Sequence, residues 1–420
     1  MLQTITPFNR FVEQSILMLF AFCVLSATTN VSWAQPNTYI TVNTSGSTVD
    51  FNNSSLWAGG VVPPDSASVT ISNASVNMNV DKVLSTVTIA GGGYITLGSS
   101  TVTILDQFLV NNSNGVLDDG GTSTLKLEST VASGGFVTIG GDNNATFYNV
   151  EVVPGSVVNF DDGGTGNTDV YVSNQLKMGG GSVIVNPPHY TSSSTLLYDA
   201  TYATVGAEWT SGASSGKGVP HHVSVGGSGS LSFGTTSSNY TCTGNFTIED
   251  ASGSLDLSGM LGDLTIDGNF TSGTNSAVTV TMPSEEGKGT VSVGGNMTLN
   301  SFTTWTGDEA NVEIRGNLAN NISGTAFGLL KFNGPADQDI TGNKITVDSL
   351  VVANTQNAVT NDTDVDFQAD VDITPGGVFN PIDGTAKITG TFTMNSDATG
   401  TARIATLADD GATSDVDGDI

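Results

Sequence analysis

The chain has 420 residues and a net charge of −29, from 40 acidic and 11 basic residues, and only 12% of its residues are charged. An acidic surface of this kind repels nucleic acid and anionic membranes, so neither is an expected partner. The length is enough for two or three ordinary domains or for one long array of repeats.

Residues 1–34 are predicted to be a secretory signal peptide, the one place where a helix is expected. The apolar run SILMLFAFCVLSA is too short for a membrane span, and Ser32 and Ala34 provide the small residues of a cleavage site before Gln35. Bulky Phe22 argues against a lipoprotein anchor at Cys23. No second apolar segment follows, so the mature chain is expected to be secreted or held at the outer cell surface, and not to be an integral membrane protein.

The stretch SLWAGGVVPPDSASVTI, residues 55–71, precedes the first clearly alternating run. Trp57 is one of only four tryptophans, and Pro63 and Pro64 follow it. A bulky ring can cover the apolar end of a core, and prolines cannot extend a strand ladder. These three residues are therefore predicted to form a structural cap.

Paired aspartates follow in two similar stretches, VLDDGGTSTLKL and NFDDGGTGNTDVYV, 43 residues apart. Carboxylates stacked on one face can gather the oxygen ligands that calcium prefers. DDGG is also typical of an exposed turn, which is the favoured interpretation. Structural calcium remains the weaker alternative, no other cofactor is expected, and the candidate ligands are Asp118, Asp119, Asp161 and Asp162.

Residues 186–222 interrupt the regular spacing of short apolar runs and contain all three histidines. His189, His221 and His222 with Glu208 could in principle bind zinc, but their spacing matches no zinc motif, and solvated loop histidines are favoured. Trp209, Tyr198 and Tyr202 lie in the same segment. If they lined an exposed groove beside two carboxylates, they would be ligand-facing and would favour carbohydrate binding or cleavage.

A repeated pattern of alternating apolar residues, Gly-Asn and another apolar residue follows from residue 240 onward. It occurs at Gly244-Asn245, Gly268-Asn269, Gly295-Asn296 and Gly316-Asn317, with weaker echoes to residue 391 and steps of 21–27 residues. Short strands at this period predict a solenoid whose coils stack into a continuous core. Gly-Asn is expected at the corners because both residues tolerate positive φ, and stacked asparagines can hydrogen-bond between coils. The lone mature cysteine, Cys242, occupies an apolar position and is predicted to be a buried structural thiol.

The sequence therefore predicts an all-β chain with a parallel β-helix, or β-solenoid, of about 21–27 residues per coil. A string of β-sandwiches is the less favoured fold, since it needs longer strands and more buried aromatics. We expect a signal peptide (1–34), a first module with an N-terminal cap (35–190), a second module entered through an irregular loop (191–345) and further coils (346–420).

The motifs LWAGGVVPPDSASVTI, LLYD…EWTSG, LLKFNGPADQDITG and GTARIATL, in this order, resemble those of large secreted repeat proteins of Bacteroidetes. Ala405 stands where that group has glycine. The resemblance covers most of residues 50–407 and implies exported β-helical surface proteins, usually carrying a C-terminal sorting domain for type IX secretion. That domain is absent here, and we expect the chain to be truncated after Ile420.

The favoured function is a secreted or cell-surface structural or adhesive β-solenoid without catalysis, whose partners are surface glycans or other extracellular proteins. The alternative is a carbohydrate-binding or carbohydrate-degrading β-helix, a glycoside hydrolase or polysaccharide lyase. The acidic pairs lie in exposed turns, and few Lys or Arg residues are available to neutralise a uronate, so catalysis is disfavoured.

Overall fold

The computed structural model describes residues 38–42, 47–111, 116–117, 122–129, 135–161, 169–202, 204–249, 253–283, 289–354, 358–361, 365–374, 377–381, 386–388, 392–394, 403–404 and 414–416. The expected signal-peptide helix and Asp118, Asp119 and Asp162 lie outside these residues. The coils belong to the compact unit Tyr39–Ile420.

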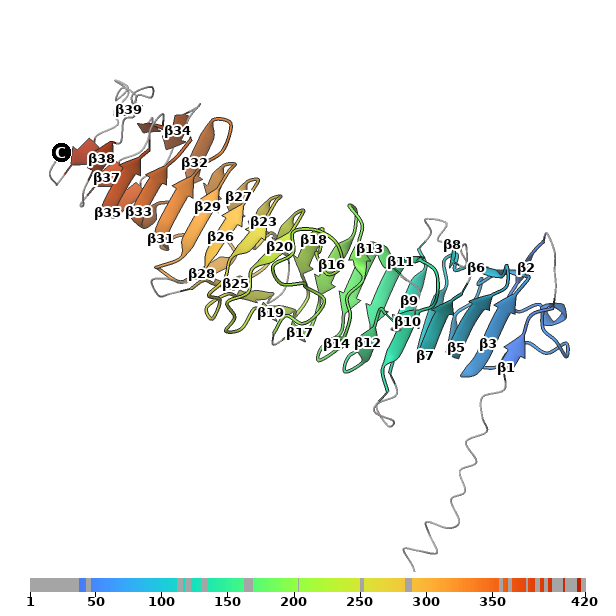
Figure 1. Ribbon diagram of the computed structural model, residues 1–420. Coiled ribbons are helices and arrows are strands. Elements are labelled where there is room, and N and C mark those ends of the chain that lie inside the picture. Colours follow the sequence, from blue (N-terminus) through green and yellow to red (C-terminus); the bar gives the residue numbers. More distant parts are fainter. Residues whose placement is uncertain are drawn as a thin grey trace, which may run out of the picture. The chain divides into compact units, whose positions relative to one another are not determined.

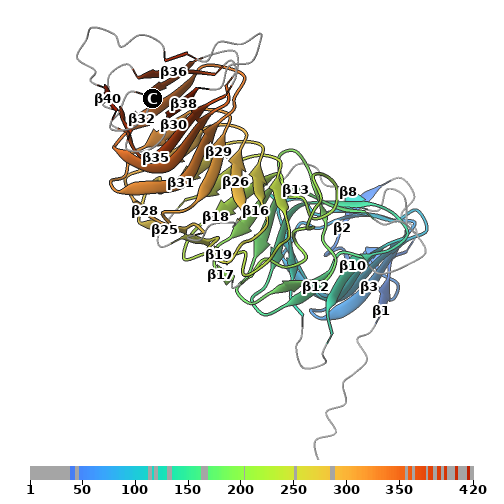
Figure 2. The ribbon, with the colours of Figure 1, turned by 60° about the vertical axis from the view of Figure 1, so that its left-hand side comes forward.

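The described chain is all-β, and its strands pair in parallel from one coil to the next, as a β-solenoid requires. Its one helical element is the 3-10 turn η1 (Ser54–Leu56). Figures 1 and 2 show the arrows of successive coils lying side by side in chain order. The predicted fold class is confirmed.

Four sheets contain these strands. The largest, with 21 strands, comprises β1 (Thr38–Ile40), β3 (Ala67–Ser72), β5 (Lys82–Ala90), β7 (Thr101–Val110), β9 (Thr124–Leu127), β10 (Val137–Gly140), β11 (Ala145–Val152), β12 (Val157–Asn159), β13 (Val170–Met178), β14 (Val183–Ile184), β15 (His189–Tyr190), β16 (Thr195–Tyr198), β18 (His222–Val225), β21 (Phe246–Ile248), β24 (Phe270–Ser272), β27 (Met297–Leu299), β30 (Leu318–Asn320), β32 (Gln338–Gly342), β34 (Ala358–Asn361), β36 (Val378–Pro381) and β39 (Arg403–Ile404).

The other three sheets form the remaining walls of the coils. The four-stranded sheet comprises β2 (Thr48–Asp50), β4 (Ser75–Asn77), β6 (Tyr94–Thr96) and β8 (Val116–Leu117). The five-stranded sheet, which Figure 2 shows along one wall, comprises β17 (Thr201–Tyr202), β19 (Ser230–Ser232), β22 (Ser254–Asp256), β25 (Val278–Thr281) and β28 (Thr303–Thr306). The ten-stranded sheet comprises β20 (Tyr240–Cys242), β23 (Leu264–Ile266), β26 (Thr290–Val293), β29 (Asn311–Ile314), β31 (Thr325–Phe332), β33 (Ile345–Val352), β35 (Val365–Ile373), β37 (Ala386–Ile388), β38 (Phe392–Met394) and β40 (Ser414–Val416).

The coils between residues 240 and 306 each contain three short strands, one from each of three sheets, such as β20, β21 and β22. In all of these strands except β28 the side chains alternate between buried and partly exposed, because successive residues of a strand point to opposite faces. The inward residues stack in register, so that Phe246 lies beside Phe270 and Phe270 beside Met297. Each coil thereby buries its apolar residues against its neighbours, which a single turn of this size could not do alone.

An asparagine column runs along one corner of the solenoid and consists of Asn245, Asn269, Asn296 and Asn317. The side-chain Oδ1 of each accepts the backbone N–H of the next, at 3.0, 2.8 and 2.9 Å, and Asn317 accepts from the N–H of Asp339 at 3.0 Å. These bonds join residues 24, 27, 21 and 22 positions apart, within the predicted coil length. The expectation that stacked asparagines link the coils is confirmed.

The reason for glycine beside these asparagines differs from the prediction. None of Gly244, Gly268, Gly295 and Gly316 is in the positive-φ region, so conformational freedom is not what the corner needs. A Cβ at Gly268 would instead lie 2.5 Å from Oδ1 of Asn245 and 2.7 Å from the carbonyl oxygen of Gly244. Glycine is present because the asparagine of the preceding coil occupies the space that a side chain would need.

Replacing Gly268 by alanine should therefore lower the free energy of unfolding by about 1–3 kcal/mol, the usual cost of overpacking. Gly226→Ala is the matched control, since its Cβ would meet nothing closer than 3.7 Å and its φ is not positive. Urea unfolding of the two variants measures the difference. Equal stabilities would contradict the close-approach explanation.

At the start of the described chain, the segment after β2 covers the outer edge of β1. Trp57 pairs with Thr41 in an antiparallel bridge, and its indole is 1% exposed. Its Nε1–H donates to the carbonyl oxygen of Phe51 at 2.8 Å, and the two rings pack edge to face at 4.9 Å. Pro63 is buried and Pro64 is exposed. The cap stays a prediction, and the burial of Trp57 at this edge supports it.

The strand pairing continues across the expected module boundaries, since β13 pairs with β16 and β33 pairs with both β31 and β35. The division into modules at residues 190 and 345 stays a prediction. No helix in the described ranges is long and apolar enough to cross a bilayer.

Candidate functional site

Residues 186–222, here called the side segment, contain the coil strands β15, β16 and β17 and then a loop, residues 204–221, that leaves the regular coils before β18. This loop is tied back to the chain around β15. The N–H of Gly218 donates to the carbonyl oxygen of Pro188 at 2.9 Å, and Oγ1 of Thr210 donates to that of Lys217 at 2.8 Å. His189 and Lys217 also form an antiparallel bridge. Between these ties, the tip at residues 211–216 is largely exposed.

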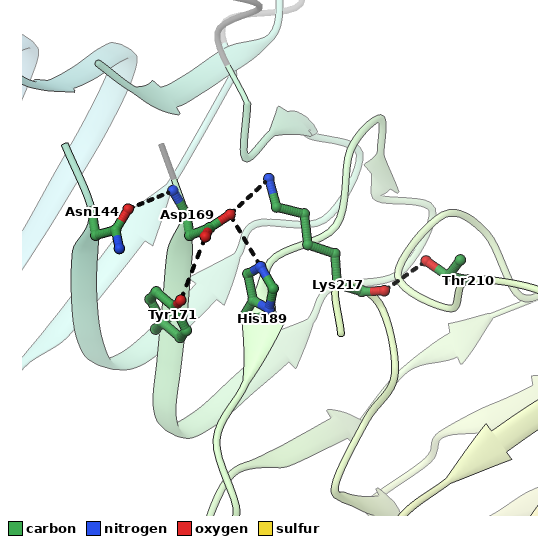
Figure 3. A network of polar contacts seen from close by, with 6 residues as sticks. All are labelled: Asn144, Asp169, Tyr171, His189, Thr210 and Lys217. Atoms are coloured by element: carbon green, nitrogen blue, oxygen red, sulfur yellow. Dashed lines mark hydrogen bonds and ion pairs between the residues drawn. The ribbon is translucent and has the colours of Figure 1, made fainter. Parts of the chain in front are cut away.

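Asp169, just before β13, holds the side segment through its carboxylate (Figure 3). Its Oδ1 lies 3.1 Å from Nε2 of His189 and 3.2 Å from Nζ of Lys217. The ring of His189 stacks on Tyr171 at 4.9 Å, and the N–H of Asp169 donates to Oδ1 of Asn144 at 3.0 Å. Asp169 therefore joins two coils and the side segment in one polar network, through its backbone N–H to Asn144 and its carboxylate to His189 and Lys217.

Burial opposes the ionisation of Asp169, but Lys217 and His189 outweigh it, so the pKa of this carboxyl lies below its ordinary value. The carboxylate of Asp169 is already bound by a lysine and a histidine. Its geometry suits an anchor for the loop better than a general acid or base. Sequence reasoning did not single out Asp169 or Lys217, because neither belongs to a recognisable motif.

The three aromatic residues expected to face a ligand are instead buried. Tyr198, Tyr202 and Trp209 are 0, 6 and 4% exposed. Trp209 packs edge to face on Phe233 at 5.5 Å, and Tyr202 lies 5.1 Å from Tyr198. Tyr198 and Tyr202 form part of the core because they occupy inward positions of the coil strands β16 and β17, and Trp209 reaches the Tyr198 hydroxyl from the loop. The three side chains do not line an exposed groove.

Glu208 lies within this aromatic cluster and is 0% exposed. Its Oε1 accepts hydrogen bonds from the hydroxyl of Tyr198 and from the N–H of Gly206, both at 2.9 Å. Nε1–H of Trp209 donates to the same Tyr198 hydroxyl at 2.9 Å, and the Tyr190 hydroxyl donates to the backbone carbonyl of Glu208 at 3.2 Å. Within the described chain, Oε2 of Glu208 makes no hydrogen bond.

Burial raises the pKa of Glu208 above its ordinary value, and the hydrogen bonds from Gly206 and Tyr198 offset this only in part. Burial and the nearby carboxyl also raise the pKa values of Tyr198 and Tyr202. All three groups therefore favour their neutral forms. A carboxyl enclosed by aromatic rings fixes the position of the side segment and is shielded from dissolved substrates.

The histidines do not come together as a metal site. His189 contacts Asp169, whereas His221 and His222 pack against each other with ring centroids 4.3 Å apart. Across the residues that the structure describes, no group of three His, Cys, Asp or Glu side chains could hold a metal ion. Of the proposed calcium ligands only Asp161 is described, and its N–H donates to Oδ1 of Asn159 at 3.1 Å.

Cys242 is buried, as predicted. Its Sγ donates to the carbonyl oxygen of His221 at 3.1 Å, and burial raises the pKa of the thiol to about 12. A thiol in this environment stays protonated and is a poor nucleophile.

A surface cavity of about 340 Å³ lies between β14 and β17. Its lining comprises Gly181, Ser182, Val183, Ile184, Thr201, Tyr202, Thr204 and Gly206, none of which is charged. The hydroxyl of Tyr202 already donates to the carbonyl oxygen of Ser182 at 2.7 Å. The cavity is at the small end of the ligand-binding range and provides few free polar groups to orient a ligand.

The described chain therefore provides an anchored, exposed loop on a regular scaffold as its most distinctive feature. Comparisons with protein-family models, curated proteins and solved structures gave no significant match.

Proposed function

We propose that this chain is an exported, non-enzymatic β-solenoid that acts as a structural or adhesive module at the cell surface. It displays the tip of the side segment, residues 211–216, from a scaffold of stacked coils. The observation that carries this proposal is the anchoring of the side segment by Asp169, through His189 and Lys217, while the tip stays exposed.

Two features of the sequence support export. Residues 1–34 have the layout of a secretory signal peptide. The motif order resembles that of secreted Bacteroidetes repeat proteins, whose usual export route is type IX secretion. We therefore place the mature chain outside the cell, with surface glycans or extracellular proteins as partners. The net charge of −29 disfavours nucleic acid as a partner.

The carbohydrate-cleaving alternative loses its main support. It relied on an exposed aromatic groove at Tyr198, Tyr202 and Trp209, and these side chains are buried. The carboxyl groups at the side segment are also occupied, since Asp169 binds Lys217 and His189, Asp199 binds Lys177 and Glu208 is enclosed.

An adhesion assay tests the proposal. Beads coated with the mature chain are applied to surfaces carrying mucin glycans, algal polysaccharides or extracellular-matrix proteins. Wild-type beads should be retained on at least one surface, and replacing residues 211–216 by a short Gly-Ser linker should abolish retention. The matched control replaces residues 274–276, another exposed or half-exposed turn. Equal retention of both variants, or no retention of the wild type on any surface, would contradict loop display.

The same polysaccharides provide a test of catalysis. Incubation with the purified chain should release no reducing ends and no unsaturated products. Release of either product would replace the scaffold proposal by the carbohydrate-degrading alternative.

A further inference from the structure

His222, at the first position of β18, stands where the next four coils have asparagine. It is the residue immediately before the inward-facing Val223, as Asn245 is immediately before Phe246. Its Nδ1 accepts the backbone N–H of Asn245 at 2.9 Å, the bond that asparagine Oδ1 makes in the later coils. The asparagine column thus begins with an imidazole, across a separation of 23 residues.

We propose that His222 makes this first link of the asparagine column a pH-sensitive contact, which breaks when the imidazole ring binds a proton. A neutral imidazole can accept a hydrogen bond at Nδ1, whereas an imidazolium carries a proton on both nitrogens and only donates. Protonation would therefore set two donors, the Asn245 N–H and the Nδ1–H, against each other. The carboxamides of the later coils have no such titration, so the effect is confined to this step.

The described groups that contact His222 are neutral or basic, so they give its protonated form no compensating partner. Thr195 of β16 lies beside it in register, and on the other side the chain presents Thr243 and Asn245, all of them neutral. Two neighbouring side chains carry ionisable groups: the ring of His221, at a centroid distance of 4.3 Å, and the thiol of Cys242, which donates to the carbonyl oxygen of His221. Asp267 acts on Cys242 from the next coil.

Burial, and then the charge of His221, lower the pKa of His222 below its ordinary value. The folded chain thus favours the neutral ring more strongly than the unfolded chain does. The stability from this contact is complete above the unfolded pKa of about 6.5 and is lost as the pH falls through the lower folded value. Mild acid, not base, should loosen the corner.

The position of this contact gives the titration a structural consequence. His222 ends the side segment and begins the regular coils, and its own N–H donates to the carbonyl oxygen of Ser194. Loosening this corner therefore weakens the link between the coil that begins at His222 and the next coil, while the asparagine links beyond Asn245 persist. This inference does not depend on the function proposed above.

Hydrogen exchange on the full chain at pH 8 and pH 5, corrected for the intrinsic pH dependence of exchange, tests the contact. The Asn245 amide should lose about tenfold in protection at pH 5, the loss expected for one ordinary hydrogen bond. The Asn269 amide, held by an asparagine, should keep its protection and provides an internal control.

The decisive variant is His222→Asn, which installs the side chain found at the same position in the later coils. Its Asn245 amide should be equally protected at both pH values. His221→Asn should retain the loss, with its midpoint at higher pH because a neighbouring positive charge is gone. The same loss in His222→Asn as in the wild type, or no loss in the wild type, would overturn the proposal.

A measurement on the unmodified chain covers the case in which His222→Asn does not fold. Nitrogen chemical shifts of the His222 ring at pH 8 should show an unprotonated Nδ1 and a protonated Nε2. A protonated Nδ1 at that pH would be incompatible with acceptance from Asn245 and would equally overturn the proposal.

Discussion

Replacing Trp57 by alanine should lower the free energy of unfolding by about 3–5 kcal/mol, the range for truncating a large buried aromatic side chain. The variant loses the edge-to-face contact with Phe51 and the Nε1–H that satisfies the Phe51 carbonyl oxygen. It also opens the core beside the outer edge of β1, which the Trp57 segment covers. Urea unfolding followed by circular dichroism measures the loss.

The location of the damage distinguishes a cap from an ordinary core residue. Coils of a solenoid interact mainly with their neighbours, so an end that loses its cover should fray from that end. Hydrogen exchange should accelerate in β1, β3 and β5 while β26 and β27 keep their protection. Trp57→Phe, which retains a ring but not the N–H, should cost about 1–2 kcal/mol. Uniform acceleration along the chain would contradict the cap.

Replacing Glu208 by alanine should lower the free energy of unfolding at pH 5 by about 2–4 kcal/mol. The buried Tyr198 hydroxyl and the N–H of the exposed Gly206 lose their common acceptor, and an unsatisfied buried group costs about 1–3 kcal/mol. Truncation of the buried side chain also leaves a cavity, which adds to the loss. Glu128→Ala is the control, because that side chain is exposed and its replacement should change stability by less than about 0.5 kcal/mol. Urea unfolding at pH 5 compares them.

The pH dependence gives a second, independent readout for Glu208. Its raised pKa means that the folded state holds the proton more tightly than the unfolded state. The resulting stability is complete below the unfolded pKa of about 4.5 and is lost as the pH rises through the folded value. Glu208→Gln keeps an acceptor but cannot ionise. Its stability relative to the wild type should therefore improve from pH 5 to pH 8, and a constant difference would show that Glu208 does not titrate in this range.

The fold was predictable because its main determinants are local and repeated. Alternation of apolar residues in runs such as LTI (264–266) gives strands, and the return of Gly-Asn at 21–27 residues gives coils. The asparagine links followed from the same repeat. The role of glycine did not, since sequence shows that Gly268 is small but cannot show that Asn245 of the preceding coil fills the space beside it.

The side segment was less predictable because its alternation is broken. Tyr198 could have been placed inside, since it stands two residues after the apolar Leu196 in β16. Trp209 offered no such pattern. Burial of Glu208 gives no sequence signal at all, because an isolated glutamate is normally exposed. His222 could have been recognised by aligning HVSV with NFTI, which places histidine over Asn245.

Because of the asparagine column, the distance between neighbouring coils does not depend on how many residues each coil contains. Its bonds have nearly the same geometry whether 21 or 27 residues lie between the two partners. The extra residues must therefore be accommodated at the other corners, where closing a longer loop costs little. A chain built in this way can gain or lose residues at those corners without shifting the strand register, and the loop between β17 and β18 is one such gain. The displayed loops can therefore change in length and sequence while the strand scaffold stays the same.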